Sequence, residues 1–333
     1  MWKILSYLQK KLIWAIPVAM IIGLASGVIM NTSFLKNAIM PLTFLMVYPM
    51  MVNLQIKKIF SGGDSKVQIF TQFINFLIIP FVAYLIGRLF FTNAPFLALG
   101  ILLAALLPTS GMTISWTGFA KGNINAAVKM TVVGLLIGSI ATPIYIQVLM
   151  GESVSVPLIS IFQQILLVVF IPMIAGQMTQ FIIIKKVGEQ KYNKDIKQKF
   201  PLISTLGVLG IVMVAMSLKA KTILADPLML INIIIPLVLM YFLNFIISTM
   251  IARRFFNRED GIALIYGSVM RNLSIALAIA MTAFGPRGSD IALVIAIAYI
   301  IQVQSAALYV TFSGKIFSWN KGENKVATEA ESN

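Results

Sequence analysis

Two stretches of this sequence combine residues that can bind a charged solute inside an otherwise apolar chain. The first, Leu107-Pro-Thr-Ser-Gly-Met-Thr-Ile-Ser-Trp116, surrounds a proline and a glycine with hydroxyl side chains. The second, Gly267-Ser-Val-Met-Arg-Asn-Leu-Ser274, places Arg271 about ten residues inside a long apolar segment. At ~1.5 Å per helical residue, Arg271 would lie roughly 15 Å deep, near the middle of a bilayer. A charge at that depth is costly and usually functional.

The composition indicates a polytopic membrane protein. Of the 333 residues, 59% are hydrophobic and 11% are charged, whereas a soluble domain carries about 25% charged residues. Cysteine and histidine are both absent, which excludes disulfides, thiolate chemistry and imidazole metal sites. Lysines precede the first apolar run and no cleavage site follows it, so we expect an uncleaved first span.

Ten apolar segments have about the length needed to cross a bilayer, although the second and the seventh are short. They cover residues 12–30, 38–54, 68–91, 95–119, 124–150, 158–184, 203–218, 228–251, 261–284 and 291–312. The sequence therefore predicts an all-α membrane protein with ten transmembrane helices.

Most lysines and arginines lie in the two termini and in alternate loops. By the positive-inside rule, both termini are expected on the cytoplasmic side of the cell membrane. The net charge of +15 then reflects topology, and no nucleic-acid partner is expected. Lys129 and Arg271 are the basic residues left within spans, whereas every Asp and Glu falls in a loop, a tail or a span edge. The basic residues of the opposite loops are Lys36, Arg88, Lys219, Lys221 and Arg287.

Local signals recur in the same order at about half the length of the chain. Residues 16–17, 41–42 and 86–91 correspond to residues 171–172, 201–202 and 251–256. Because five spans per half is an odd number, the two halves would be inverted, as in many secondary transporters. We predict a 5+5 inverted repeat with halves 1–155 and 156–318, interleaved in one transport domain, and a polar cytoplasmic tail at 319–333.

The fourth and ninth helices are the ones predicted to be broken. Pro108 removes a backbone hydrogen bond, and Gly111 with its hydroxyl neighbours can line the resulting gap. Freed backbone groups and helix ends at two such breaks make a polar cavity for an ion or small solute. The alternative is a plain proline kink. The candidate binding residues are Pro108, Thr109, Ser110, Gly111, Thr113, Lys129, Gly267, Arg271, Asn272 and Ser274.

These features resemble the bile acid:sodium symporter and arsenical-resistance-3 superfamily over nearly the whole chain. The arsenite-permease branch is the most similar, since its second helix often reads like Val47-Tyr-Pro-Met-Met-Val-Asn53. Its fourth helix resembles Pro108-x-x-x-Met112-x-x-x-Trp116, followed by a turn like residues 121–123. The resemblance implies a transporter of ten helices with broken fourth and ninth helices.

The chain departs from both branches at the residues that bind their ligands. The arsenite branch has a cysteine where this chain has Thr109 and a glutamate where it has Ser274. In the sodium-coupled branch, the sodium-binding asparagine of the fourth helix corresponds to Ile114. These replacements argue against thiol capture of arsenite and against ordinary sodium coupling.

The ninth and fifth helices add to this difference. The glutamate and glutamine of the sodium-coupled branch correspond to Gly267 and Arg271, while its asparagine is retained as Asn272. The resemblance adds Thr131 as the match for a fifth-helix hydroxyl ligand. Arg271, with Lys129, would occupy space where relatives bind sodium, and its charge would hold the broken helices together or neutralise an anion. Alternatively, Lys129 extends to the membrane interface.

We expect a secondary active transporter of a small solute, similar to arsenite and antimonite efflux permeases and not ordinarily coupled to sodium. In that case Thr109, Ser110 and Thr113 would offer hydroxyls in place of the thiol. The alternative is a sodium- or proton-linked transporter of small organic anions. An enzyme is not expected, because the spans lack the residues that membrane enzymes need. Broken repeats also favour a transporter over a channel. No cofactor or bound metal is expected, and the partners are the lipid bilayer and a small-molecule or oxyanion substrate.

Overall fold

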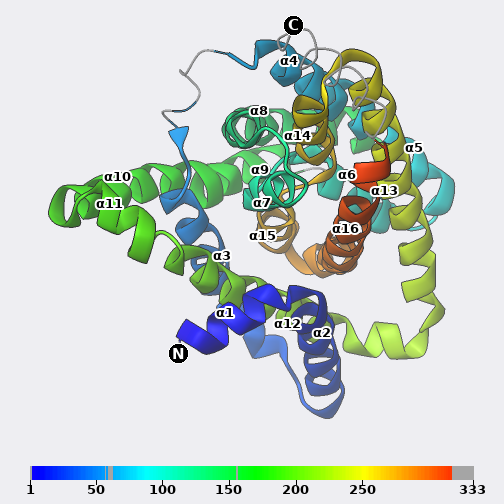
Figure 1. Cartoon of the computed structure of the whole chain (residues 1–333). Coiled ribbons are helices and arrows are strands. Elements are labelled where there is room, and N and C mark those ends of the chain that lie inside the picture. The colour runs from blue at the N-terminus through cyan, green and yellow to red at the C-terminus, as the bar shows by residue number, and fades with distance from the viewer. Residues whose placement is uncertain (1, 57, 59–62, 155–156, 317–333) are drawn as a thin grey trace, which may run out of the picture.

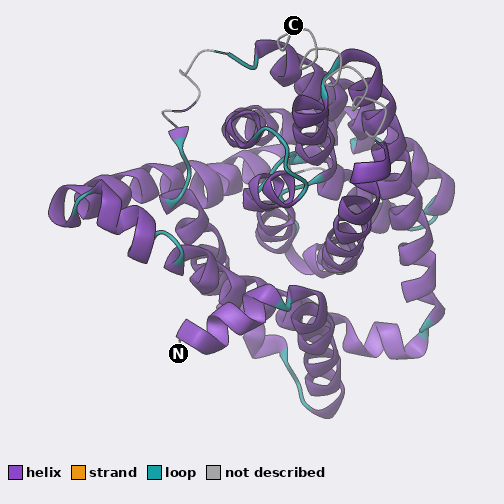
Figure 2. Ribbon diagram, in the orientation of Figure 1, coloured by secondary structure: helices purple, strands orange, loops and turns teal. Residues whose placement is uncertain are grey.

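The computed structural model describes residues 2–56, 58, 63–154 and 157–316, and these residues are helical nearly throughout (Figure 2). No β-strand occurs among them. The predicted all-helical class is confirmed for this part of the chain, while the predicted tail at 319–333 lies outside the described residues.

Seven helical segments are long and apolar enough to cross a membrane. They are Ser33–Val52, Ser65–Phe90, Ile124–Met150, Leu158–Val187, Lys199–Ala225, Leu228–Phe255 and Gly285–Ser313. Shorter apolar helices cover Trp14–Ile29, Pro95–Leu106 and Leu273–Ala283.

The helices form two groups (Figure 1). The α12 group contains α1 (Trp2–Lys10), α2 (Leu12–Ile29), α3 (Ile39–Val52), α10 (Ile171–Val187) and α12 (Lys199–Ala225). The α16 group contains α4 (Ser65–Phe73), α5 (Ile79–Phe90), α6 (Pro95–Leu106), α7 (Gly111–Phe119), α8 (Ile124–Met150), α13 (Leu228–Phe255), α14 (Arg258–Val269), α15 (Leu273–Ala283) and α16 (Gly288–Ile316). Between the groups, α9 (Leu158–Ile165) packs on α8 and α15. The short α11 (Glu189–Lys191) follows α10.

The boundary between the groups runs along α12 and α16, which pack on each other. These are the most enclosed of the seven spans, with 61% and 67% of their apolar windows buried. The predicted short seventh span, 203–218, is wrong because α12 continues through two lysines to Ala225. Within this part of α12, the Lys219 ammonium is neutralised by Asp290 of α16, with 2.6 Å between Nζ and Oδ1.

Asparagine caps begin the helices that follow two polar turns. The side-chain oxygen of Asn123 accepts a hydrogen bond from the amide of Ala126 at 3.0 Å, which begins α8. Asn257 accepts one from the amide of Asp260 at 2.9 Å, which begins α14. Such caps satisfy amides that have no partner within the helix. The same two turns are joined by a backbone bond from the Asn123 amide to the Glu259 carbonyl, at 3.0 Å.

Candidate transport site

The two predicted helix breaks are present and lie against each other. Helix α6 ends at Leu106 and α7 begins at Gly111, while α14 ends at Val269 and α15 begins at Leu273. Between them, Pro108 and Arg271 form a short antiparallel bridge.

Two backbone hydrogen bonds hold this bridge. The amide of Thr109 donates to the carbonyl of Met270, and the amide of Asn272 donates to the carbonyl of Leu107, each at 2.7 Å. Each extended segment thus supplies hydrogen-bond partners for backbone groups of the other segment that have none within their own helix. In an apolar interior, such backbone groups need a partner.

Polar side chains restart both helices after the breaks. The Ser110 hydroxyl accepts from the amide of Met112 at 3.2 Å, and the Thr113 hydroxyl accepts from the amide of Ser110 at 3.1 Å. In α15, the side-chain oxygen of Asn272 accepts from the amide of Ile275 at 3.3 Å. The reciprocal capping by Ser110 and Thr113 at the start of α7 explains why Ser and Thr follow the proline. It also uses the Thr113 hydroxyl as a backbone partner.

Thr109 has a backbone conformation that is unusual for a β-branched residue. Its φ is +64°, in the left-handed region that such residues rarely adopt. Its fully buried hydroxyl lies 2.6 Å from its neighbour's carbonyl at Pro108 and 3.2 Å from that of Met130 on α8. The side chain therefore faces α8.

A cavity of about 360 Å³ lies between the α12 group and the α16 group. Residues of both breaks line it, and its other wall includes Ser204, Thr205 and Val208 of α12. The predicted site residues that line the cavity are Ser110, Gly111, Thr131, Arg271, Asn272 and Ser274. Those that do not are Pro108, Thr109, Thr113, Lys129 and Gly267. None of the described residues that line it is acidic.

Arg271 belongs to the lining of this cavity, and its backbone is held by Gln302 of α16. The residue is 1% exposed. Its amide donates to the side-chain oxygen of Gln302 at 2.8 Å, and the Gln302 amide group donates back to its carbonyl at 3.2 Å. By contrast, the Nε, Nη1 and Nη2 atoms have no hydrogen-bond partner within the described part of the chain. A guanidinium carries five donor hydrogens, and within the described residues none of those of Arg271 has an acceptor.

Sequence reasoning missed three polar residues around Arg271. Gln302 also accepts a hydrogen bond from the Tyr241 hydroxyl at 3.0 Å. The Tyr299 hydroxyl forms a hydrogen bond with that of Ser274, and both Tyr299 and Gln302 line the cavity. The sequence could have revealed Gln302, because it is a glutamine near the middle of an apolar span, where polar groups are rare.

Partly exposed polar residues line the cavity at the end of the molecule where α12 begins. They include Gln9 of α1, Asn53 after α3, and Lys197 before α12. Burial, and then the nearby charge of Lys58, lowers the pKa of Lys197. The side-chain amide of Asn53 donates to the Lys197 carbonyl at 2.8 Å, which ties the two chain segments together.

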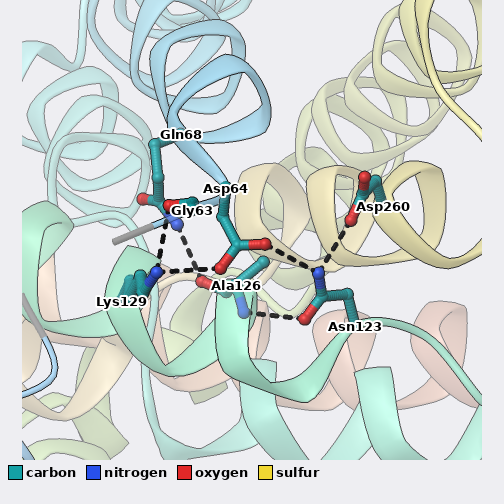
Figure 3. A network of polar contacts seen from close by, with 7 residues as sticks. All are labelled: Gly63, Asp64, Gln68, Asn123, Ala126, Lys129 and Asp260. Carbon is teal, nitrogen blue, oxygen red and sulfur yellow. Dashed lines mark hydrogen bonds and ion pairs between the residues drawn. The ribbon is translucent and has the colours of Figure 1, made fainter. Parts of the chain in front are cut away.

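Lys129 belongs to a separate polar network (Figure 3). Its ammonium lies 2.9 Å from the Asp64 carboxylate and 3.0 Å from the Gly63 carbonyl. The side-chain amide of Asn123 donates to both Asp64 and Asp260, at 2.9 and 2.8 Å. Lys129 is 5% exposed and does not line the cavity, and its charge is neutralised by Asp64, a loop residue directly before α4.

The apolar spans define an integral membrane protein, and its cavity is lined by residues of both helix breaks. The chain belongs to the sodium bile acid symporter family, whose model matches residues 40–226. It is therefore a membrane transporter, and the names of its relatives indicate a transporter rather than an enzyme.

Similarity to individual proteins agrees with the resemblance seen in the sequence. The chain is 26% identical over 295 residues to the arsenical-resistance protein Acr3 of Alkaliphilus metalliredigens (strain QYMF), covering 84% of this chain and 81% of that one. It is 27% identical over 214 residues to the uncharacterized sodium-dependent transporter YocS of Bacillus subtilis (strain 168), covering 64% and 63%. It is 30% identical over 115 residues to the sodium/bile acid cotransporter 7 of Danio rerio, covering 34% of each.

The contact between α8 and the first break predicts the effect of a single methyl group. A Cβ on Gly134 would lie 2.6 Å from the Thr109 hydroxyl oxygen, which has no room to move. Gly134→Ala should therefore lower stability by roughly 1–3 kcal/mol, measured by thermal unfolding in detergent. Gly118→Ala is the matched control, because its nearest contact would be 3.7 Å away. Equal stability of the two variants would contradict the close approach.

The network around Lys129 predicts a loss of stability without a loss of binding. Lys129→Met leaves Asp64 without its ammonium partner and should lower the free energy of unfolding by about 1–3 kcal/mol. Any ligand response that depends on Arg271 should persist. The double variant Lys129→Met/Asp64→Asn should recover part of the stability. A normal melting temperature combined with a lost ligand response would instead place Lys129 in the transport site.

Proposed function

We propose that this protein is a secondary active transporter of a small anion, a carboxylate or an oxyanion, that uses Arg271 as the counter-charge and does not require sodium. The observation that carries this proposal is the buried guanidinium of Arg271, a residue of the cavity lining, which has no hydrogen-bond partner among the described residues. A buried charge without a partner costs several kcal/mol. An anion that accepts hydrogen bonds from the guanidinium offsets that cost.

The surroundings of Arg271 also suit an anion. Helices α7 and α15 begin at the two breaks, so the positive ends of their dipoles lie at the cavity, which both Ser110 and Asn272 line. The volume of about 360 Å³ is roughly twelve times the ~30 Å³ that a water occupies in the liquid. There is room for a small organic anion or a hydrated oxyanion.

The lining supports transport that does not depend on sodium. Hard cations prefer oxygen ligands, and a buried site normally includes at least one carboxylate. Here no acidic residue lines the cavity among those described, and Ile114 contributes an apolar side chain to it. A sodium ion bound in the cavity would also be repelled by the buried positive charge of Arg271, a residue of the lining.

We further propose the ten-span arrangement that the repeat predicts. The seven long segments and α2 supply eight spans. The pairs α6–α7 and α14–α15 would supply the two broken ones, with residues 1–155 and 156–318 as inverted halves. The crossing of the two breaks supports this proposal, and the lysine-rich loops support a cytoplasmic location for both termini.

Replacement of Arg271 separates a binding role from a structural one. Arg271→Met should remove an unpaired buried charge and raise the free energy of unfolding by about 1–3 kcal/mol. It should also abolish stabilisation by anions. The measurement is thermal unfolding of purified protein in detergent, with acetate, lactate, phosphate, sulfate and arsenate tested singly.

Two further conditions complete this test. Arg271→Lys keeps the charge but loses the planar pair of donors, so it should retain a weakened anion response. Equal concentrations of sodium and potassium salts should give the wild type the same response. The proposal fails if Arg271→Met lowers stability and still responds to anions. It also fails if any anion response requires sodium.

A second candidate is efflux of arsenite or antimonite, which the similarity to an arsenical-resistance protein favours. Of the hydroxyl residues Thr109, Ser110 and Thr113, only Ser110 lines the cavity. Expression in an arsenite-sensitive bacterial host should confer resistance if this candidate is correct. Because arsenous acid is neutral, that resistance should survive Arg271→Met. The candidate is rejected if expression gives no protection and does not change arsenite uptake.

A further inference from the structure

We infer that the ion pair between Lys219 and Asp290 is a latch that closes one end of the cavity and breaks when the transporter exposes its site to the opposite side of the membrane. The inference rests on the transporter function and on the proposed orientation. It does not depend on which solute is carried.

The pair joins the two helix groups. Lys219 lies on α12 and Asp290 in the first turn of α16, with 2.6 Å between Nζ and Oδ1. The Lys129–Asp64 pair, in contrast, lies within the α16 group. An interaction within one group moves with that group, whereas an interaction between groups must change when the groups move relative to each other.

The position of the pair along both helices places it away from the cavity mouth. The cavity-lining residues of α12 end at Val208, and Lys219 is about 16 Å farther along that helix at ~1.5 Å per residue. On α16, Asp290 precedes Tyr299, which lines the cavity, by about 14 Å. The partly exposed lining residues, including Asn53 and Lys197, lie at the opposite end, where α12 begins.

Helices α12 and α16 therefore meet at the end that carries the ion pair, and their opposite parts form walls of the cavity. Between Val208 and Lys219, α12 is buried at Ile211, Val212 and Ala215. In the proposed latch, the packing of α12 on α16 and the ion pair between them close this end of the cavity. The lining residues at the opposite end, where α12 begins, are partly exposed. The structure therefore corresponds to the state in which the cavity opens at that end and is closed at the end with the ion pair.

The environment of the pair suits a contact that forms and breaks. The side chains of Lys219 and Asp290 are 15% and 13% exposed. This is enough shielding to strengthen their attraction and enough exposure for water to replace it after separation. Arg287 lies 3.8 Å from the second carboxylate oxygen, but its own side chain is 66% exposed. The amino-terminal end of α16 also favours the negative charge of Asp290. Asp290 therefore remains stabilised when Lys219 moves away.

The chain contains no cysteine, so one introduced thiol reports access to the cavity without further engineering. Thr205→Cys places it on α12 within the cavity lining. In intact cells, a membrane-impermeant maleimide should label this thiol slowly from outside. Adding Lys219→Ala or Asp290→Asn should accelerate external labelling roughly fivefold, the shift expected when an ordinary ion pair is lost. Lys219→Arg preserves the pair and should label like the parent.

Three controls make the outcome decisive. Lys221→Ala removes a neighbouring charge from the exposed part of α12 and should leave the rate unchanged. In inside-out vesicles, labelling of the Thr205→Cys thiol should slow when external labelling accelerates, whereas unfolding would accelerate both. Lys221→Cys alone should label from outside, which tests the orientation separately. The latch is refuted if Lys219→Ala and Asp290→Asn label like the parent, or if Lys221→Ala accelerates labelling equally.

Discussion

The exchange of two backbone hydrogen bonds between the helix breaks is the constraint on which the site depends. An amide or carbonyl without a partner is costly in an apolar interior, and each break leaves such groups exposed. The Thr109 amide and the Leu107 carbonyl find their partners at Met270 and Asn272. Neither break is therefore stable without the other. Their pairing sets Pro108 opposite Arg271 and directs the starts of α7 and α15 towards the cavity.

The two buried cations, Lys129 and Arg271, lie in different surroundings. Lys129 has a carboxylate partner in Asp64, supplied by a loop before α4. Arg271 has a firmly held backbone but no partner for its guanidinium within the described residues. The first arrangement stabilises the ends of α8 and α14 through Asn123. The second leaves a buried charge without a hydrogen-bond partner, at a cost to stability, and such a charge inside a membrane protein is usually functional.

The two walls of the cavity belong to different helix groups. This is consistent with transport by movement of one helix group against the other. The α16 group supplies both breaks and the Gln302 support for Arg271, while the α12 group supplies the facing wall. The largest contact between the groups is that of α12 with α16, and α2 also packs on α16 and α3 on α15. Because packed surfaces of this kind slide or rotate as units, contacts at their ends decide which end is open.

The sequence by itself determined the membrane class, both breaks and the family. These follow from local properties, namely hydropathy, proline geometry and a charge far inside an apolar run. Only the tertiary structure decided that Ser110 lines the cavity while Thr109 and Thr113 do not, because side-chain direction at a break depends on the opposing segment. It also paired Lys129 with Asp64, and Lys219 with Asp290 across two helix groups. Such contacts join residues far apart in the chain, and no local pattern specifies which opposite charge lies within reach of a lysine.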